Sequence, residues 1–226
     1  IFYLRVRNVK SETQNIITEQ RLLRSQMTPH FIFNALSVLQ GIILNKENKK
    51  AVSYLSKFSK LLRTTLENSR EQMVSLNQEL IAIENYISLQ NIEVDAPYNY
   101  SIIVDSMIDK DQFYIPPMLI QPFIENAIEH GFVNHKGEKE LTVILNYTNK
   151  VLTCTIKDNG IGIDAQKTNS NQDKKSLSTA ITTERLELLS RNTKNKGSIH
   201  VEDRKKYNEQ GTLVTLIIPY RIEVYW

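Results

Sequence analysis

His30 is the residue in this chain whose type and setting best suit covalent chemistry. It lies in the string Pro29-His-Phe-Ile-Phe-Asn34. An imidazole nitrogen is a competent nucleophile near neutral pH, because its unperturbed pKa is about 6.5. Asn34 follows one helical turn later on the same face, where its amide could hold the other ring nitrogen or orient a water. A histidine among apolar residues is also often a packed core residue, so the residue alone leaves both interpretations open.

A second group of polar residues lies on one predicted helix. Asn126 and His130 are one turn apart, and Glu125 and Glu129 are paired in the same way. Magnesium prefers oxygen ligands and keeps several waters, so the Asn126 amide oxygen together with nucleotide phosphates would make a suitable shell. The alternative is a helix with an ordinary solvated side, which any string of this composition would satisfy.

The third group is a glycine-rich turn, Asp158-Asn-Gly160-Ile-Gly162. Its glycines permit a tight turn and a close approach of the backbone to a planar base. A carboxylate at the end of a strand could accept a hydrogen bond from an exocyclic amine. An isolated Asp-Asn-Gly string is otherwise a weak turn signal.

Taken in order, these three segments resemble the phosphoacceptor, asparagine and glycine boxes of the LytS/YehU-type sensor histidine kinases. The resemblance runs from about Gln26 to Pro219. It implies that His30 accepts a phosphoryl group from ATP, that Asn126 binds Mg2+, and that Asp158 reads the adenine amino group. Thr212, in a closing Gly-Thr pair, would support that carboxylate. The site residues that the resemblance implies are His30, Asn34, Glu125, Asn126, His130, Asp158, Gly160, Gly162, Arg185 and Thr212.

The chain differs from related kinases and from the wider ATPase superfamily in three places. Residues 176–186 keep the Arg-Leu helix but have serines and threonines where related kinases have a second glycine-rich box. These groups and backbone N–H groups could still cradle phosphates, with Lys174 and Lys175 assisting or forming a solvated charge pair. Pro122 stands where the wider ATPase superfamily often has a water-activating Glu, which disfavours hydrolysis to water. Phe31 stands where many other histidine kinases have an acid, so no general base is assigned.

The resemblance implies ATP- and Mg2+-dependent autophosphorylation of His30, followed by transfer to an aspartate of a response regulator receiver domain. It also implies a homodimer. A rival interpretation is a signalling scaffold that binds nucleotide weakly, catalyses nothing and acts through helix-mediated dimerisation; the missing glycines and unassigned base favour it. A nucleic-acid partner is disfavoured, because the net charge is only +3 and the basic residues are scattered among 25 acidic ones.

Helical periodicity dominates the first third of the chain. Residues 8–27 have a narrow apolar seam typical of a helix that pairs with a copy of itself. Apolar residues recur at helical spacing over 28–44 and 52–66, which predicts a hairpin of two helices, and two hairpins would make a dimeric four-helix bundle. A capping box then opens another helix, with either Ser75 or Asn77 as the cap.

Strand patterns follow in the remainder of the chain. Strands interleaved with helices predict an α+β fold with a mixed sheet covered by helices. The resemblance implies an N-terminal helical hairpin or coiled coil followed by an α/β sandwich of the Bergerat (GHKL) kind. We expect three parts: a signalling helix (1–27), a dimerisation and phosphotransfer hairpin (28–75) and an ATP-binding domain (76–226). Expected strands are 98–104, 141–146, 151–157, 198–202 and 212–219, and expected helices are 117–131 and 181–191. The polar stretch 164–178 is expected to be a disordered loop or a lid.

Composition and the first residues indicate the class of protein and the compartment in which it works. The 41% hydrophobic and 23% charged fractions fit an ordinary globular protein. The single cysteine, Cys154, sits in an apolar strand pattern and is expected to be a buried, inert thiol, consistent with a reducing compartment. Residues 1–7 read like the end of an apolar helix followed by arginines. We therefore hypothesise an upstream membrane anchor or sensor domain and a cytoplasmic location at the inner or plasma membrane for this portion.

Overall fold

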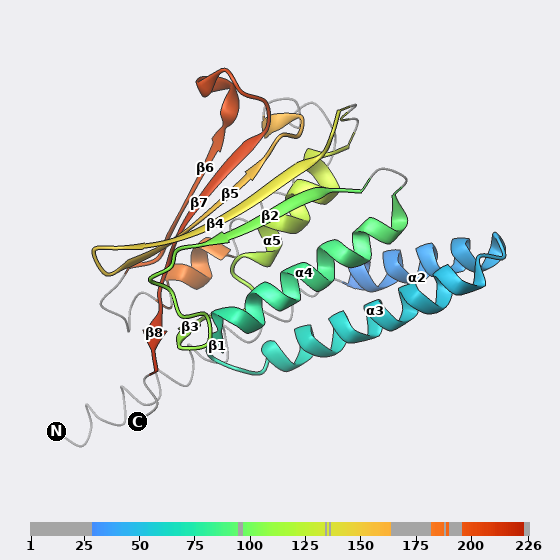
Figure 1. The fold of residues 1–226 in the computed structure, drawn as a ribbon, viewed down its shortest axis with the longest axis horizontal. Helices are drawn as coiled ribbons and strands as arrows, with labels where there is room; N and C mark the ends of the chain where they lie inside the picture. The colour runs from blue at the N-terminus through green and yellow to red at the C-terminus, as the bar shows by residue number, and fades with distance from the viewer. Residues whose placement is uncertain are drawn as a thin grey trace.

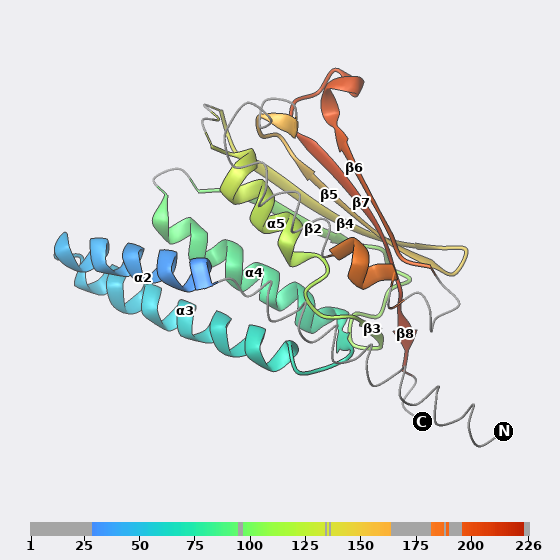
Figure 2. The same cartoon turned by 180° about the vertical axis from the view of Figure 1, so that it is seen from behind.

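A computed structural model describes residues 29–94, 97–133, 135, 137–163, 182–187, 189 and 196–223, with side chains from residue 32 onward except that of Glu93. These residues form three layers: a five-stranded sheet, a layer of helices against one of its faces, and a helical hairpin outside those helices (Figure 1; Figure 2). The predicted helix 8–27 and the predicted lid 164–178, with Lys174 and Lys175, lie outside the described residues.

The hairpin consists of α2 (Pro29–Leu44) and α3 (Asn48–Asn68). The buried side chains of α3 recur every three or four residues, from Ala51 to Asn68, and so form one face. That face packs against α2 and against α4 (Leu76–Glu93). The Lys57 ammonium also donates to Ser88 Oγ at 2.7 Å, joining α3 to α4. The predicted hairpin is therefore present, and it shares its core with the helix that follows.

The capping box at the start of α4 is formed by Ser75 and Gln78. The Gln78 N–H donates to Ser75 Oγ at 3.2 Å, and the Ser75 N–H donates to Gln78 Oε1 at 2.9 Å. The first of the two predicted caps is thus confirmed. Asn77 instead donates its side-chain amide to Asp111.

Replacing Ser75 with alanine is expected to lower the free energy of unfolding by about 1 kcal/mol, because the Gln78 N–H loses its acceptor. Urea unfolding followed by circular dichroism would measure the change. Ser53→Ala, at an exposed interior position of α3, is the control and should change stability by less than about 0.5 kcal/mol. Equal effects of the two substitutions would contradict the capping role.

The large sheet has the strand order β2-β4-β5-β7-β6. Its strands are β2 (Asn99–Val104), β4 (Glu140–Thr148), β5 (Val151–Asp158), β6 (Ser198–Asp203) and β7 (Thr212–Ile218). β2 runs parallel to β4, whereas the other neighbours are antiparallel, so the predicted mixed sheet is confirmed. The β4–β5 hairpin turns at Asn149 and Lys150, both at positive φ, as a two-residue hairpin requires.

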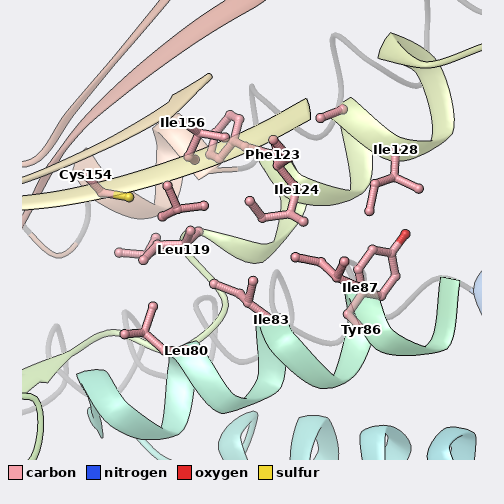
Figure 3. Close-up of a cluster of buried hydrophobic side chains, with 14 of the residues drawn as sticks. Leu80, Ile83, Tyr86, Ile87, Leu119, Phe123, Ile124, Ile128, Cys154 and Ile156 are labelled. Atoms are coloured by element: carbon pink, nitrogen blue, oxygen red, sulfur yellow. The ribbon is translucent and has the colours of Figure 1, made fainter. Parts of the chain in front are cut away.

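The core lies between this sheet and α4. Alternate side chains of β4, β5 and β7 are buried, as the period of a strand with one covered face demands. Figure 3 shows side chains of α4, of the segment around α5 (Gln121–Asn126) and of the sheet meeting in one cluster. Those labelled there are Leu80, Ile83, Tyr86, Ile87, Leu119, Phe123, Ile124, Ile128, Cys154 and Ile156. Cys154 is fully buried, which raises the pKa of its thiol, and the predicted inert role agrees with this.

Two features of the fold differ from the sequence predictions. The helix expected to begin at residue 117 begins at Gln121, because Met118 has a φ of 57° that no helix accommodates. A second, three-stranded sheet was not predicted, since strands of two or three residues are too short to show alternation. It consists of β1 (Val74–Ser75), β3 (Phe113–Ile115) and β8 (Arg221–Ile222).

Candidate active site

The segment that carries Asn126, residues 117–131, is called the asparagine segment here. Its helix type changes at Asn126. The α-helix α5 ends at this residue, and Ala127–Gly131 continue as a π-helical turn, η1, closed by the Phe132 N–H donating to the Ala127 carbonyl at 3.0 Å. Such turns are wider than an α-helical turn and occur often at functional sites. Here the turn carries His130, which is half-buried, and it ends with Gly131 at the edge of the glycine-rich turn.

A buried carboxylate from α4 holds the start of this segment. Glu79 is fully buried; its Oε2 accepts from the Met118 N–H at 2.8 Å, and its Oε1 accepts from the Ile120 N–H at 3.3 Å. Ile120 at the N-cap of α5 makes no side-chain capping bond, so Glu79 supplies the acceptor from another helix. Burial raises the pKa of Glu79, and these backbone bonds and the charge of Arg185 oppose the rise.

Arg185 is on the helical segment 182–187, and its side chain is fully buried. Its positive charge acts on the Glu79 carboxylate. The buried guanidinium therefore has an electrostatic partner, the Glu79 carboxylate, inside the core. The nucleotide contact that the resemblance implied for Arg185 stays a prediction.

Glu125 is half-buried and has a pKa near neutrality. Burial raises the pKa of its carboxyl to about 7; the Gln121 side chain, which donates to Oε1 at 2.8 Å, opposes the rise, and the Glu129 charge adds to it. A carboxyl group with this pKa can take up or release a proton at neutral pH.

The raised pKa of Glu125 predicts a pH dependence of stability. Its carboxyl binds a proton more tightly in the folded chain, where its pKa is about 7, than in the unfolded chain, where the ordinary value of 4.5 applies. The contribution of Glu125 to stability should therefore be present in full below pH 4.5 and fall by about 1–3 kcal/mol as pH rises through 7. Urea unfolding at pH 5, 6, 7 and 8 should show a flatter profile for Glu125→Gln than for wild type. Glu84→Gln, at an exposed position on α4, should keep the wild-type slope, and a shared slope for all three proteins would contradict the assignment.

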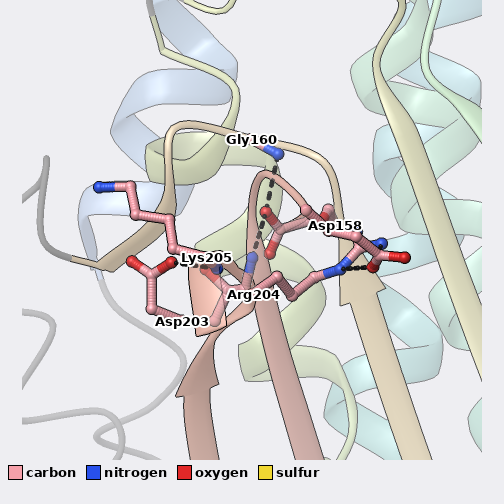
Figure 4. A network of polar contacts seen from close by, with 7 residues as sticks. Asp158, Gly160, Asp203, Arg204 and Lys205 are labelled. Carbon is pink, nitrogen blue, oxygen red and sulfur yellow. Dashed lines mark hydrogen bonds and ion pairs between the residues drawn. The ribbon is translucent and has the colours of Figure 1, made fainter. Parts of the chain in front are cut away.

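The glycine-rich turn closes around the carboxylate of Asp158. This residue ends β5 and is buried, and its Oδ1 accepts from the N–H of Gly160 at 2.9 Å and of Thr212 at 3.1 Å (Figure 4). The predicted support from Thr212 thus includes its backbone N–H. The Ile161 N–H donates to the Gly131 carbonyl at 2.8 Å. The end of the asparagine segment and the start of the glycine-rich turn are therefore in contact.

Two glycines of the turn are needed for different reasons. A Cβ on Gly160 would lie 2.2 Å from the Gly131 carbonyl oxygen, so only hydrogen fits between the two backbones. Gly162 has a φ of 80°, which disfavours any L side chain. Both positions were predicted from the sequence, and the backbone contact explains the first of them.

Asn159 has a role beyond that of a turn residue. Its side chain accepts from the Glu140 N–H at 2.9 Å and donates to the Glu138 carbonyl at 2.8 Å. This bidentate contact joins the glycine-rich turn to the start of β4. Nothing in the sequence distinguishes this asparagine from one that merely favours a turn.

The predicted phosphoacceptor, His30, lies on a different layer of the fold from Asp158 and the glycine-rich turn. The backbone of His30 is in the first turn of α2, and its side chain is outside the described residues. The Asn34 side chain is exposed on the same helix. The hairpin lies outside the helix layer (Figure 1; Figure 2). Asp158, in contrast, is the last residue of β5 in the large sheet. The pairing of His30 with Asn34 stays a prediction.

Comparison with known proteins gives a separate match for each of the two parts of the chain. Residues 18–97 match the family model described as histidine kinase, and residues 117–222 match that of histidine kinase-, DNA gyrase B- and HSP90-like ATPases. The chain belongs to the histidine kinase family. The sensor protein LytS of Staphylococcus saprophyticus is 30% identical over 93% of this chain and 36% of its own length. The sensor histidine kinase/phosphatase LytS of Staphylococcus aureus is 31% identical over 74% of this chain and 29% of its own length.

This histidine kinase chain spans about a third of the length of such relatives. A solved histidine kinase domain, from the blue-light-activated kinase of Erythrobacter litoralis EL346, covers 91% of this chain at 14% identity with a TM-score of 0.48, and the match covers 94% of that domain. In the portion of the chain that the structure describes, no helix has the length and apolar character needed to cross a membrane.

Proposed function

We propose that this chain is the kinase portion of a sensor histidine kinase of a two-component system, which binds ATP at Asp158 and transfers its γ-phosphoryl group to His30. The observation that carries this proposal is the buried Asp158 carboxylate, held by two backbone N–H groups where the asparagine segment meets the glycine-rich turn. A carboxylate oriented in this way can accept from the exocyclic amine of adenine. The closely packed glycine backbone of the turn allows the base to lie against it.

The phosphates and Mg2+ belong on the asparagine segment. Within the described residues, no three acidic, histidine or cysteine side chains are grouped to hold a metal ion. The Asn126 amide oxygen would suit an ion that arrives with the triphosphate and keeps phosphate and water ligands. Bound there, Mg2+ would neutralise charge on the phosphates. Asn126, His130 and Glu125 would orient the triphosphate for transfer.

In the transfer step, a ring nitrogen of His30 forms a bond to the γ-phosphorus as the bond from phosphorus to the ADP oxygen breaks. The ring loses a proton in the process. The pKa of Glu125, about 7, suits the acceptor of that proton at neutral pH. The phosphoryl group would then pass to an aspartate carboxylate of a response regulator receiver domain.

Dimerisation would use the outer face of the hairpin. Phe33, Leu44 and Val52 are each more than 60% exposed there, as expected of residues that a second hairpin covers. We propose residues 1–27 as a signalling helix, 28–75 as the dimerisation and phosphotransfer unit, and 76–226 as the ATP-binding unit. A sensor or membrane anchor upstream, with this portion in the cytoplasm, would complete the protein.

Incubation with γ-labelled ATP and Mg2+ tests the proposal. Label should appear on wild type, be absent from His30→Gln, and show the acid lability of phosphohistidine. His135→Gln removes another histidine and should retain the label. ATP binding without any label would instead favour the non-catalytic scaffold.

A further inference from the structure

The connection between β6 and β7 forms a rigid corner beside the glycine-rich turn. Arg204–Tyr207 form a 3-10 turn, η2, and Asn208 then adopts a left-handed conformation. The Arg204 N–H donates to the Gly211 carbonyl at 2.9 Å, and the Glu209 N–H donates to the Arg204 carbonyl at 3.2 Å. The Arg204 guanidinium also forms an ion pair with Glu209. The corner therefore holds its shape through its own contacts.

Arg204 reaches from this corner to the backbone of the site. Its Nη1 donates to the Asp158 carbonyl oxygen at 2.6 Å, while its Nε donates to Glu209 at 3.0 Å (Figure 4). The side chain is only 17% exposed, so solvent competes poorly for this bond. The guanidinium thus fixes the peptide group between Asp158 and Asn159, the first of the glycine-rich turn.

Asp203 holds the other end of the same turn. Its Oδ2 accepts from the Ile163 N–H at 2.9 Å, and its Oδ1 accepts from the Lys205 N–H at 2.9 Å. A Cβ on Gly162 would lie 2.8 Å from Oδ2, so the carboxylate lies directly against that glycine. Two adjacent residues therefore hold residue 158, which begins the glycine-rich turn, and residue 163, which directly follows it.

We propose that Asp203 and Arg204 form a clamp that holds the glycine-rich turn in its base-binding conformation, which makes them positioning residues for the nucleotide outside the three motifs. The effect of the clamp on ATP binding rests on the proposed function, whereas its effect on the turn itself does not. The clamp acts on backbone groups, so it orders the turn before any ligand arrives. Binding then costs less conformational entropy.

Calorimetric titration with ATP and Mg2+ would test the clamp in Arg204→Met, Asp203→Asn and Lys206→Met. Lys206 is the matched control, because it lies in the same 3-10 turn but pairs with Glu202. The loss of a charge-assisted bond predicts affinity weaker by roughly 10- to 100-fold for Arg204→Met and Asp203→Asn. Lys206→Met should bind like wild type. Arg204→Lys should recover part of the affinity, since a lysine ammonium can also donate to the Asp158 carbonyl.

Amide hydrogen exchange provides a readout that needs no nucleotide. The N–H groups of Gly160 and Ile163 should exchange at least tenfold faster in the two clamp variants than in Lys206→Met, with similar melting temperatures. Unchanged exchange, or exchange that accelerates across the whole sheet, would overturn the clamp. Wild-type protein that binds no adenine nucleotide would overturn the proposed function instead, and the exchange result would still decide whether the clamp exists.

Discussion

Replacing Glu79 with alanine is expected to lower the free energy of unfolding by about 3–5 kcal/mol, because the substitution leaves several buried groups without their acceptor. The N–H groups of Met118 and Ile120 both donate to this carboxylate. Arg185, fully buried, would lose the negative charge that it faces. These two N–H groups lose their acceptor whether or not the Glu79 carboxyl is ionised.

Urea unfolding of Glu79→Ala and Glu84→Ala measures this effect. Glu84 lies on the same helix with its side chain exposed, so its removal should change stability by less than about 0.5 kcal/mol. A difference between the two variants below about 1 kcal/mol would show that Glu79 does not organise the segment before α5.

Gly160→Ala is expected to abolish nucleotide binding, with affinity falling by at least about 100-fold. The new methyl carbon would lie 2.2 Å from the Gly131 carbonyl oxygen, and neither backbone can yield without moving the other. Separation of these backbones would displace Asp158 relative to Asn126. The stability of the protein should fall by only about 1–3 kcal/mol, the usual cost of overpacking.

Gly41→Ala is the control for this experiment, because a Cβ at that position of α2 meets nothing within 4 Å. It should bind ATP like wild type and be slightly more stable, as alanine favours helix. ATP binding by Gly160→Ala within a few-fold of wild type would mean that the contact with Gly131 does not shape the site.

The parts of the fold that could be predicted from the sequence are those with a sustained periodic pattern. Alternation in β4, β5 and β7 and the three-to-four-residue spacing in α3 follow directly from burial on one face. The short strands β1, β3 and β8 carry no such pattern. The positive φ of Met118 had no signal either; its N–H donates to Glu79, a residue 39 positions earlier in the chain.

The residues of the candidate site also fall into those that the sequence predicted and those that it did not. The family resemblance predicted Asp158 and Gly160, and the structure places both against the end of the asparagine segment. Glu79, Asn159 and Arg204 were not predicted. Each acts on backbone groups of another segment, and such contacts leave no trace in local residue types. Their roles could be found only once the chain was folded.

The most direct test of the account is a calorimetric comparison of ATP with inosine triphosphate, which lacks the exocyclic amine. If Asp158 reads that amine, ATP with Mg2+ should bind at least about tenfold more tightly than inosine triphosphate, and Asp158→Asn should remove most of the difference. Equal affinity for the two nucleotides, or no heat from either at millimolar concentration, would contradict the account.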